Sequence, residues 1–475
     1  MDRRNFFGAS AAAAAGLATG DALAANTTHR GVAQRSSRDT VRIDRRYNDP
    51  NLSRPIPINK DRAYEVMAQL GIDGLVALRP HNVFYLANTV PVLTPFGEEY
   101  PGFATFPRDP QQPSFLITST GNTWDTENGE RDVPEVITFS GASNWRDYVD
   151  ATPQQAHTEP QSVGKAGFGF AVKENGELTQ RERGWKRAQE VYNPDSAPTA
   201  AWAIARALRR SGLEKGRIAV DDMRIAYLLK SIGFDGVTVI DGDNVFRKIR
   251  HIKTSHEIGL LRIAQTITRE SALAAARAIE VGMTYQDFRQ RLFTEAVARG
   301  GEPGFVLLGI TQGLLPAGVV RKGDSYLLDC SVHYQMYQGD FARTVMIGEP
   351  RAESMKRFRA QQAARETAFG MIRAGVPFRE VEKVAREAMI KAGMPKNVPA
   401  ISLHSVGLQH GDDPQRDRLP FKVRDDHVLA ENMTVTLDLP YLEVGEGAGH
   451  NEDLLRITRT GFELLNDPSD PLIVV

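Results

Sequence analysis

Cysteine, long apolar runs and an excess of one charge are what this sequence has least of. Cys330 is the single cysteine among 475 residues, so no disulfide can form within the chain. The formal net charge is -1, and acidic and basic residues are mixed without long runs, which predicts no nucleic-acid partner and no anionic membrane surface as a target. The alanine-rich stretch Ala9–Ala18 is too short and too weakly hydrophobic to cross a bilayer.

Residues 1–25 have the pattern of a twin-arginine signal peptide. Arg3 and Arg4 precede the alanine-rich stretch, and Ala22-Leu23-Ala24 is a small-x-small cleavage site. We therefore expect a periplasmic protein, exported already folded by the twin-arginine route and without a stable membrane anchor after cleavage. A flexible N-terminal extension is the alternative. Residues 26–55 are polar, which is typical of a linker or an extended arm.

Residues 56–245 alternate between helical and strand patterns, which indicates an α/β domain with a parallel or mixed sheet. Helical spacing covers residues 61–70 and 199–210. The predicted strands cover residues 74–78, 115–118, 135–139 and 218–220. Residues 144–184 are polar and rich in glycine, which predicts loops. Residues 79–86 are expected to run from a strand into a turn, where His81 and Asn82 are either turn formers or parts of a ligand loop.

Residues 246–475 show a second pattern. A basic strand from Phe246 is expected to lead to Ser255 as the N-cap of a helix that ends near Val281. Further helices are predicted over residues 285–299, 353–374 and 379–392, and strands over residues 305–310 and 325–329. Two helices, strands, two helices and strands again indicate an internal duplication within an α+β domain.

Two carboxylates stand at the margins of neighbouring strand patterns. Asp329 ends an apolar run, and Asp340 follows eleven residues later beside a second run. Two strands joined by a short turn could bring both side chains to one point, where they would offer hard oxygen ligands to one or two divalent cations. The alternative is that each aspartate caps a turn.

Three further polar residues lie at strand margins downstream, namely His404, Asp438 and Glu452. Each of them taken singly is better explained by a structural role. Together with Asp329 and Asp340 they provide four carboxylates and one imidazole, the ligand types that a two-cation hydrolytic site needs.

From Phe246 to its C-terminus the sequence resembles the pita-bread superfamily of methionine aminopeptidases, Xaa-Pro aminopeptidases, prolidases and creatinase. The motifs that carry the resemblance are Arg250-x-x-Lys253-x-x-x-Glu257-Ile258, Gly282-Met283-Thr284, Asp329 with Asp340, His404-x-x-Gly407-Leu408 and Glu452-Asp453. Gly71-Ile72-Asp73-Gly74 is similar to the N-terminal domain of the prolidase and creatinase branch. The resemblance implies an α+β protein, with a pita-bread domain over residues 246–475 preceded by a smaller creatinase-type α/β domain over residues 56–245.

The same resemblance implies the chemistry. Two divalent ions, of Mn, Co, Zn or Fe, would be held by Asp329, Asp340, His404, Asp438 and Glu452. A hydroxide shared by the ions would attack the peptide bond, with Asp438 or Glu452 as the proton shuttle. The substrate would be a short peptide with proline in its second position, and relatives with this N-terminal domain imply a homodimer.

Several positions depart from the family pattern. Asp438 stands where a glutamate is usual, and His450 where an arginine is usual. An upstream histidine is missing around Gln312, and Gly411 replaces a second histidine, with His410 one residue earlier. Gln312, His410 and His450 are therefore candidates, beside Glu452, for catalytic roles, or they are ordinary loop residues.

The expected function is thus an exported metal-dependent hydrolase of the Xaa-Pro aminopeptidase or dipeptidase type. One alternative is a non-peptidase member that acts on a small charged molecule, as a creatinase-like hydrolase or a lyase. Another is a catalytically degenerate binding protein. The retained carboxylates argue against degeneration, because unpaired buried acids cost several kcal/mol.

Overall fold

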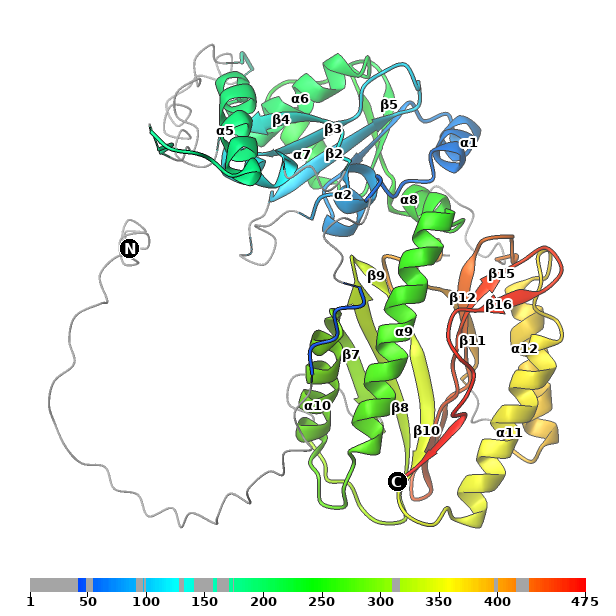
Figure 1. Ribbon diagram of the computed structural model, residues 1–475. Helices are drawn as coiled ribbons and strands as arrows, with labels where there is room; N and C mark the ends of the chain where they lie inside the picture. Colours follow the sequence, from blue (N-terminus) through cyan, green and yellow to red (C-terminus); the bar gives the residue numbers. More distant parts are fainter. Residues whose placement is uncertain are drawn as a thin grey trace, which may run out of the picture. The chain divides into compact units, whose positions relative to one another are not determined.

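A computed structural model gives the arrangement of most of the chain after residue 41 (Figure 1). The residues that it describes are 42–47, 54–90, 97, 100–127, 132–140, 157–159, 171–173, 175–309, 317–396, 400–415 and 427–475. The predicted signal peptide lies outside these residues, as do Gln312 and most of the predicted linker. Within them, no helix is both long enough and apolar enough to cross a membrane.

The N-terminal part of the described chain is built on one mixed sheet. The strands, in spatial order, are β4 (Glu135–Phe139), β3 (Phe115–Ser119), β2 (Gly102–Pro107), β1 (Gly74–Ala77), β5 (Arg217–Val220) and β6 (Thr238–Asp241). β1 pairs antiparallel with β2 and parallel with β5. Every residue of β1 and β2 is buried, which fits their central places in the sheet.

Helices accompany this sheet at the places where apolar spacing follows the helical period. They are α1 (Lys60–Leu70), α2 (Pro80–Ala87), α5 (Gln180–Tyr192), α6 (Ala200–Arg210), α7 (Arg224–Ser231) and α8 (Asp243–Arg250), with short 3-10 segments at Thr120–Glu127 and Asn193–Asp195. The Asn59 side chain caps α1 by accepting a hydrogen bond from the Arg62 amide, and Gly71 ends the helix in the left-handed conformation. The buried residues of α1 are Ala63, Val66 and Met67, and the helix covers the predicted range to within one residue.

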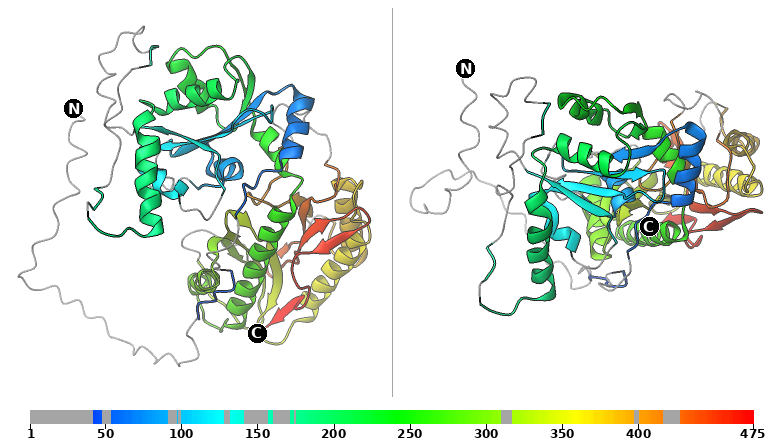
Figure 2. Two further views of the ribbon diagram at one scale, coloured as in Figure 1. Left: turned by 45° about the horizontal axis from the view of Figure 1, so that its top comes forward. Right: turned by 90° about the horizontal axis from the view of Figure 1, so that it is seen from above.

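The C-terminal part contains two larger sheets, each with a pair of helices (Figures 1 and 2). The first sheet has the order β17 (Leu472–Val474), β10 (Phe341–Met346), β8 (Ser325–Tyr334), β7 (Glu302–Leu308), and β9 (Tyr337–Gln338) also pairs with β8. The second sheet has the order β11 (Ser402–Ser405), β12 (Thr434–Asp438), β15 (Leu454–Ile457), β16 (Phe462–Leu464). A small hairpin is formed by β13 (Tyr441–Glu443) and β14 (Gly447–Gly449).

The helices of the first pair are α9 (Ser255–Arg277) and α10 (Tyr285–Ala298), and those of the second are α11 (Ala352–Phe369) and α12 (Phe378–Lys391). α9 packs against β8 and α10 against β7, while α12 packs against α11 and β11. α9 begins with a capping box in which Thr254 and Glu257 bond each other's backbone amides. This arrangement of two sheets with two helix pairs is the one that an internal duplication predicts.

The structure corrects three details of the sequence analysis. Residues 80–87 form α2 instead of a turn, because Pro80 occupies the first helical turn and the apolar run behind it is buried. The predicted basic strand from Phe246 is part of α8, and the N-cap of α9 is Thr254 instead of Ser255. The boundary predicted between Val245 and Phe246 falls inside α8, and the proposed division into domains stays a prediction.

Candidate metal centre

Strand register brings three acidic residues together in the first sheet. Asp329 on β8 lies opposite Ala342 on β10, and Ala342 in turn forms an isolated bridge with Glu452. Asp340 immediately precedes β10, two residues from Ala342, so its side chain is on the same side of the strand. The carboxylates of Asp329, Asp340 and Glu452 therefore come from three adjacent segments of chain.

The second sheet supplies the other two predicted ligands. β11 and β12 pair antiparallel with Ser402 opposite Asp438 and His404 opposite Thr436. Because side chains alternate along a strand, all four of these residues share one face. His404 Nε2 lies 3.4 Å from Asp438 Oδ2, 3.9 Å from Asp340 Oδ2 and 4.0 Å from Glu452 Oε1.

The five predicted ligands thus meet at one place, which we call the cage: Asp329, Asp340, His404, Asp438 and Glu452. Three overlapping groups of potential ligand atoms lie within 4.8 Å of one another there. They are Asp329 with His450 and Glu452, Asp340 with His404 and His410, and His404 with Asp438 and Glu452. His410 and His450 were predicted as catalytic candidates, and both lie against the cage.

The donor atoms fit divalent cations. Asp340 is fully buried and Glu452 is 2% exposed. Within the described chain, Asp329 Oδ1 and both carboxylate oxygens of Asp340 are buried without a hydrogen-bond partner. Buried carboxylate oxygens normally have partners, and a divalent cation is the partner that several converging carboxylates and imidazoles would suit.

The comparison with known families gives the site its context. Residues 259–459 match the model of metallopeptidase family M24. This segment is an M24 domain. It contains the whole cage, together with His410 and His450. The M24 assignment and the mixed α/β structure confirm the predicted pita-bread membership and fold class.

The named relatives of this chain are distant in sequence. An Xaa-Pro dipeptidase of Pyrococcus horikoshii is 25% identical over 239 residues, which are 49% of this chain and 67% of that protein. A dipeptidase structure from the same organism has a TM-score of 0.64 at 17% identity and covers 88% of this chain and 99% of its own. An Xaa-Pro dipeptidase structure from Bacillus anthracis has a TM-score of 0.63 at 18% identity, with the same coverage of 88% and 99%. These structures show that the fold is shared across the N-terminal sheet and the M24 domain.

Crowding of carboxylates changes their proton affinity. Burial, followed by the charges of Asp340 and Asp438, raises the pKa of Asp329 well above its usual range, and the same three causes raise the pKa of Glu452. Burial opposes the charged form of His404, but its hydrogen bond to Asp438 and the charges of Asp438 and Asp340 raise its pKa to about 10. Against the effect of burial, His404 lowers the pKa of Asp438. Burial and neighbouring charges thus favour the protonated forms of Asp329 and Glu452 when no ion is bound.

Hydroxyl and amide groups orient the cage residues. Ser402 Oγ donates to Asp438 Oδ2 at 2.6 Å, and Thr436 Oγ1 donates to Glu452 Oε1 at 2.6 Å. Gln265 on α9 bonds the backbone of Asp340 through both its amide atoms, at 2.7 and 2.8 Å. Sequence reasoning missed these three residues. Ser402 and Thr436 stand two residues before His404 and Asp438, so strand periodicity could have found them, whereas nothing local marks Gln265.

The loop after β11 carries His410. Its Nε2 lies 3.1 Å from Asp340 Oδ2, its ring makes an edge contact with Phe305, and its side chain is 42% exposed. Two residues further on, Asp412 is fully buried and paired with Arg250 and Lys253. The ion pairs therefore fix the loop that presents His410 to the M24 site. Gln312, the remaining catalytic candidate, lies outside the described residues.

Proposed function

We propose that this protein is a metal-dependent peptidase that hydrolyses short peptides with proline in the second position. The observation that carries the proposal is the meeting of four carboxylates and His404 in an M24 domain, with buried oxygens of Asp329 and Asp340 lacking partners in the described structure. The similarity to proteins named Xaa-Pro dipeptidase supports the substrate class. The cage residues would hold two divalent ions.

Bound there, the ions would polarise the scissile carbonyl and lower the pKa of a water molecule. Glu452 would accept the proton that the attacking water releases as the new C–O bond forms, and pass it to the leaving nitrogen as the C–N bond breaks and the carbonyl re-forms. Thr436 orients the Glu452 carboxylate by donating a 2.6 Å hydrogen bond to Oε1. His410 would donate from its ring to the carbonyl oxygen, because its side chain lies beside the cage and is 42% exposed.

The decisive experiment measures metal content and peptide cleavage together. Purified protein loaded with Mn or Zn should release proline from Gly-Pro, or the first residue from an Xaa-Pro-Xaa peptide. Asp340→Asn should lose metal binding and cleavage together, because Asp340 belongs to the cage and is fully buried. Asp467→Asn is the matched control, since the Asp467 side chain is 63% exposed.

The outcomes separate the three functional classes. Wild-type protein that binds metal but cleaves no proline peptide would favour a reaction on a small charged molecule instead. Wild-type protein that binds no metal under any loading condition would favour a binding protein without catalysis.

We propose in addition that the protein is exported by the twin-arginine route, on the basis of Arg3, Arg4 and the alanine-rich stretch behind them. Replacing both arginines by lysine should leave the protein in the cytoplasmic fraction. Wild-type protein found only in that fraction would contradict the proposal.

A further inference from the structure

The side chain of His450 is buried beside the cage. His450 is 3% exposed. Potential ligand atoms, one each from His450, Asp329 and Glu452, lie within 4.8 Å of one another. His450 and Glu452 are two positions apart on one segment, and His450 Nε2 lies near Glu452 Oε2, so the two side chains lie next to each other. The segment therefore directs one imidazole and one carboxylate toward Asp329.

The separation of His450 and Glu452 is close to that of two ligands of one ion. His450 Nε2 lies 3.7 Å from Glu452 Oε2, which is too long for a hydrogen bond. Ligand atoms that bind one cation at about 2.0 to 2.2 Å stand roughly 3 to 3.6 Å from each other. Within the described residues, Oδ1 of Asp329 is buried and has no hydrogen-bond partner. An ion between the three side chains would satisfy this oxygen.

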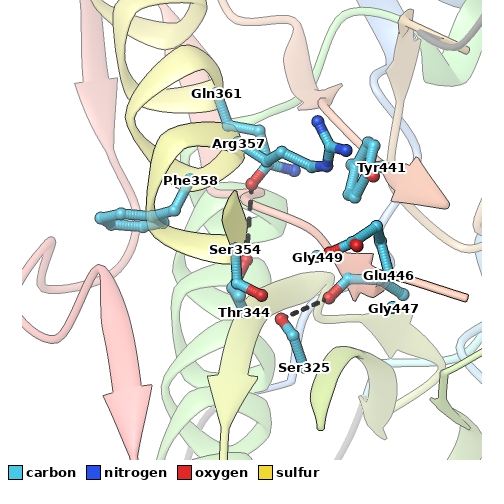
Figure 3. Close-up of a pocket in the computed structure, with 11 residues that line it drawn as sticks. Ser325, Thr344, Ser354, Arg357, Phe358, Gln361, Tyr441, Glu446, Gly447 and Gly449 are labelled. Carbon is cyan, nitrogen blue, oxygen red and sulfur yellow. Dashed lines mark hydrogen bonds between the residues drawn. The ribbon is translucent and has the colours of Figure 1, made fainter. Parts of the chain in front are cut away.

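The backbone of His450 is held in place. Thr344 Oγ1 accepts a hydrogen bond from the His450 amide at 3.1 Å and is also 3.1 Å from the His450 carbonyl oxygen, to which it donates. A Cβ atom on Gly449 would come within 2.7 Å of the same Oγ1, so this close approach requires glycine. Figure 3 shows Thr344 and Gly449 among the residues that line a neighbouring pocket, to which His450 does not belong. Thr344 therefore holds His450 at both its backbone amide and its backbone carbonyl.

We propose that His450 is a metal ligand that shares an ion with Asp329 and Glu452. The cage of this chain then places one imidazole at each ion, His404 at one and His450 at the other. The inference rests on the proposed function only in taking the cage to hold ions. It replaces the catalytic role that the sequence suggested for His450.

An added imidazole changes which metal the site prefers. Carboxylates suit Mn, whereas imidazole suits Zn and Fe. Loss of a group that merely supports a ligand reduces metal affinity by about 10 to 100-fold, so loss of a ligand should cost at least as much. We expect His450→Gln to lower the affinity for Zn by about tenfold or more, and the affinity for Mn by less.

X-ray absorption of the zinc-loaded protein tests the ligand itself, independently of catalysis. The imidazole scattering per zinc should fall in His450→Gln relative to wild type, as it should in His404→Gln. His256→Gln, which removes a half-buried histidine at the start of α9, is the matched control and should leave the scattering unchanged. Unchanged scattering in a fully loaded His450→Gln protein would overturn the inference.

A second variant keeps the inference open to refutation if His450→Gln does not fold. The double variant His404→Gln with His410→Gln should still show imidazole scattering, because His450 remains. Complete loss of that scattering would refute the ligand role. Peptide cleavage assayed on the same samples separates the two proposals, since an imidazole signal from His450 in a protein that cleaves no proline peptide would refute only the proposed function.

Discussion

The side chain of His410 combines two properties that a group acting on substrate needs. It is 42% exposed, and its Nε2 lies 3.1 Å from Asp340 Oδ2 at the edge of the cage. Asp340, by contrast, is fully buried, and the His404 side chain is 16% exposed. His410 is therefore placed to meet a peptide while touching a residue that would hold an ion.

Replacing His410 by alanine should reduce kcat by about 100-fold, the usual cost of losing one donor to a developing oxyanion. Metal content should stay at the wild-type level, because the five cage residues are untouched. Steady-state kinetics on an Xaa-Pro peptide, with metal analysis of the same sample, checks both points. His256→Ala should behave as wild type. A rise in KM with kcat unchanged would assign His410 to substrate binding instead.

At the scale of elements, α8 and α2 meet the loop that carries His410. Arg250, the last residue of α8, donates from Nε and Nη2 to Asp412 Oδ1 at 3.0 and 2.6 Å. It also donates from Nη1 to the side chain of Asn82 on α2. Lys253 Nζ donates to the other oxygen of Asp412 at 3.2 Å. All four side chains are buried, so this ionic network replaces apolar packing where these elements join.

Arg250→Met should lower the free energy of unfolding by about 3 to 5 kcal/mol, because it leaves Asp412 buried with fewer partners. Chemical denaturation measures the loss. Arg262→Met is the matched control, since Arg262 pairs with Glu463 while both side chains are more than 40% exposed, at 43% and 41%. The control should change stability by at most about 1 kcal/mol. Similar losses in the two variants would contradict the role given to burial.

Sequence patterns predicted those helices and strands that are specified by the apolar spacing of their own residues. The positions of the apolar residues predicted α1, α10 and β3 almost to the residue. The apolar residues of these elements are the ones that the structure buries. The sequence analysis missed α8 because its basic residues suggested a solvent-exposed segment. In the structure, Arg247 and Arg250 are buried in ion pairs with Asp243 and Asp412. Asp412 is far away in the sequence, and no local pattern reveals such a partner.

The candidate site shows the same division. Its cage residues could be picked out because each carries an acid or imidazole at a strand margin, where apolar residues would be ordinary. The hydrogen bond from Ser402 to Asp438 depends on the register of β11 against β12, which a single sequence does not reveal. The depth of His450, which decides between a ligand and a substrate-binding residue, also depends on packing from distant segments such as Thr344.

Asp221 provides a pH-dependent link between the N-terminal strands and α2. Its carboxylate accepts hydrogen bonds from the amides of Leu78 and Arg79 at 2.8 and 3.0 Å and from the Asn82 side chain at 2.8 Å. Burial raises the pKa of Asp221 from 3.8 to about 6, in spite of these donors. Since one pKa unit corresponds to about 1.4 kcal/mol, this change amounts to about 3 kcal/mol.

The sign follows from proton binding. Between about pH 4 and pH 6, the folded state holds a proton on Asp221 that the unfolded state has released. The free energy of unfolding should therefore fall as pH rises through this window and then level off. Asp221→Asn should lack this contribution. Denaturation of both proteins at several pH values gives the difference in their free energies of unfolding. A difference that does not vary over this window would contradict the prediction.

At the scale of the whole described molecule, the cage joins two sheets. Asp329 belongs to β8 of the first sheet and Asp340 immediately precedes β10 of the same sheet, whereas His404 and Asp438 belong to β11 and β12 of the second. Glu452 connects them, because it bridges to Ala342 on β10 and leads into β15. Ions held by these residues would therefore link the two halves of the M24 domain, and their removal would leave carboxylates facing one another across that contact.

Removing metal with a chelator should lower the melting temperature by a few degrees, and adding Mn or Zn at about 100 times the dissociation constant should restore about 2.7 kcal/mol. The effect should grow as pH rises. Burial and neighbouring acids raise the pKa values of Asp329 and Glu452 in the protein without ions, so the chelated protein loses stability as pH rises and these groups lose their protons. Ions compete with those protons, and they bind better once the protons have left. Calorimetry of chelated and metal-loaded protein at acidic and at neutral pH checks both statements, with Asp340→Asn as the variant that should not respond to metal. A stabilisation by metal that is larger at acidic pH would contradict the assignment of the acid cluster as the ion site.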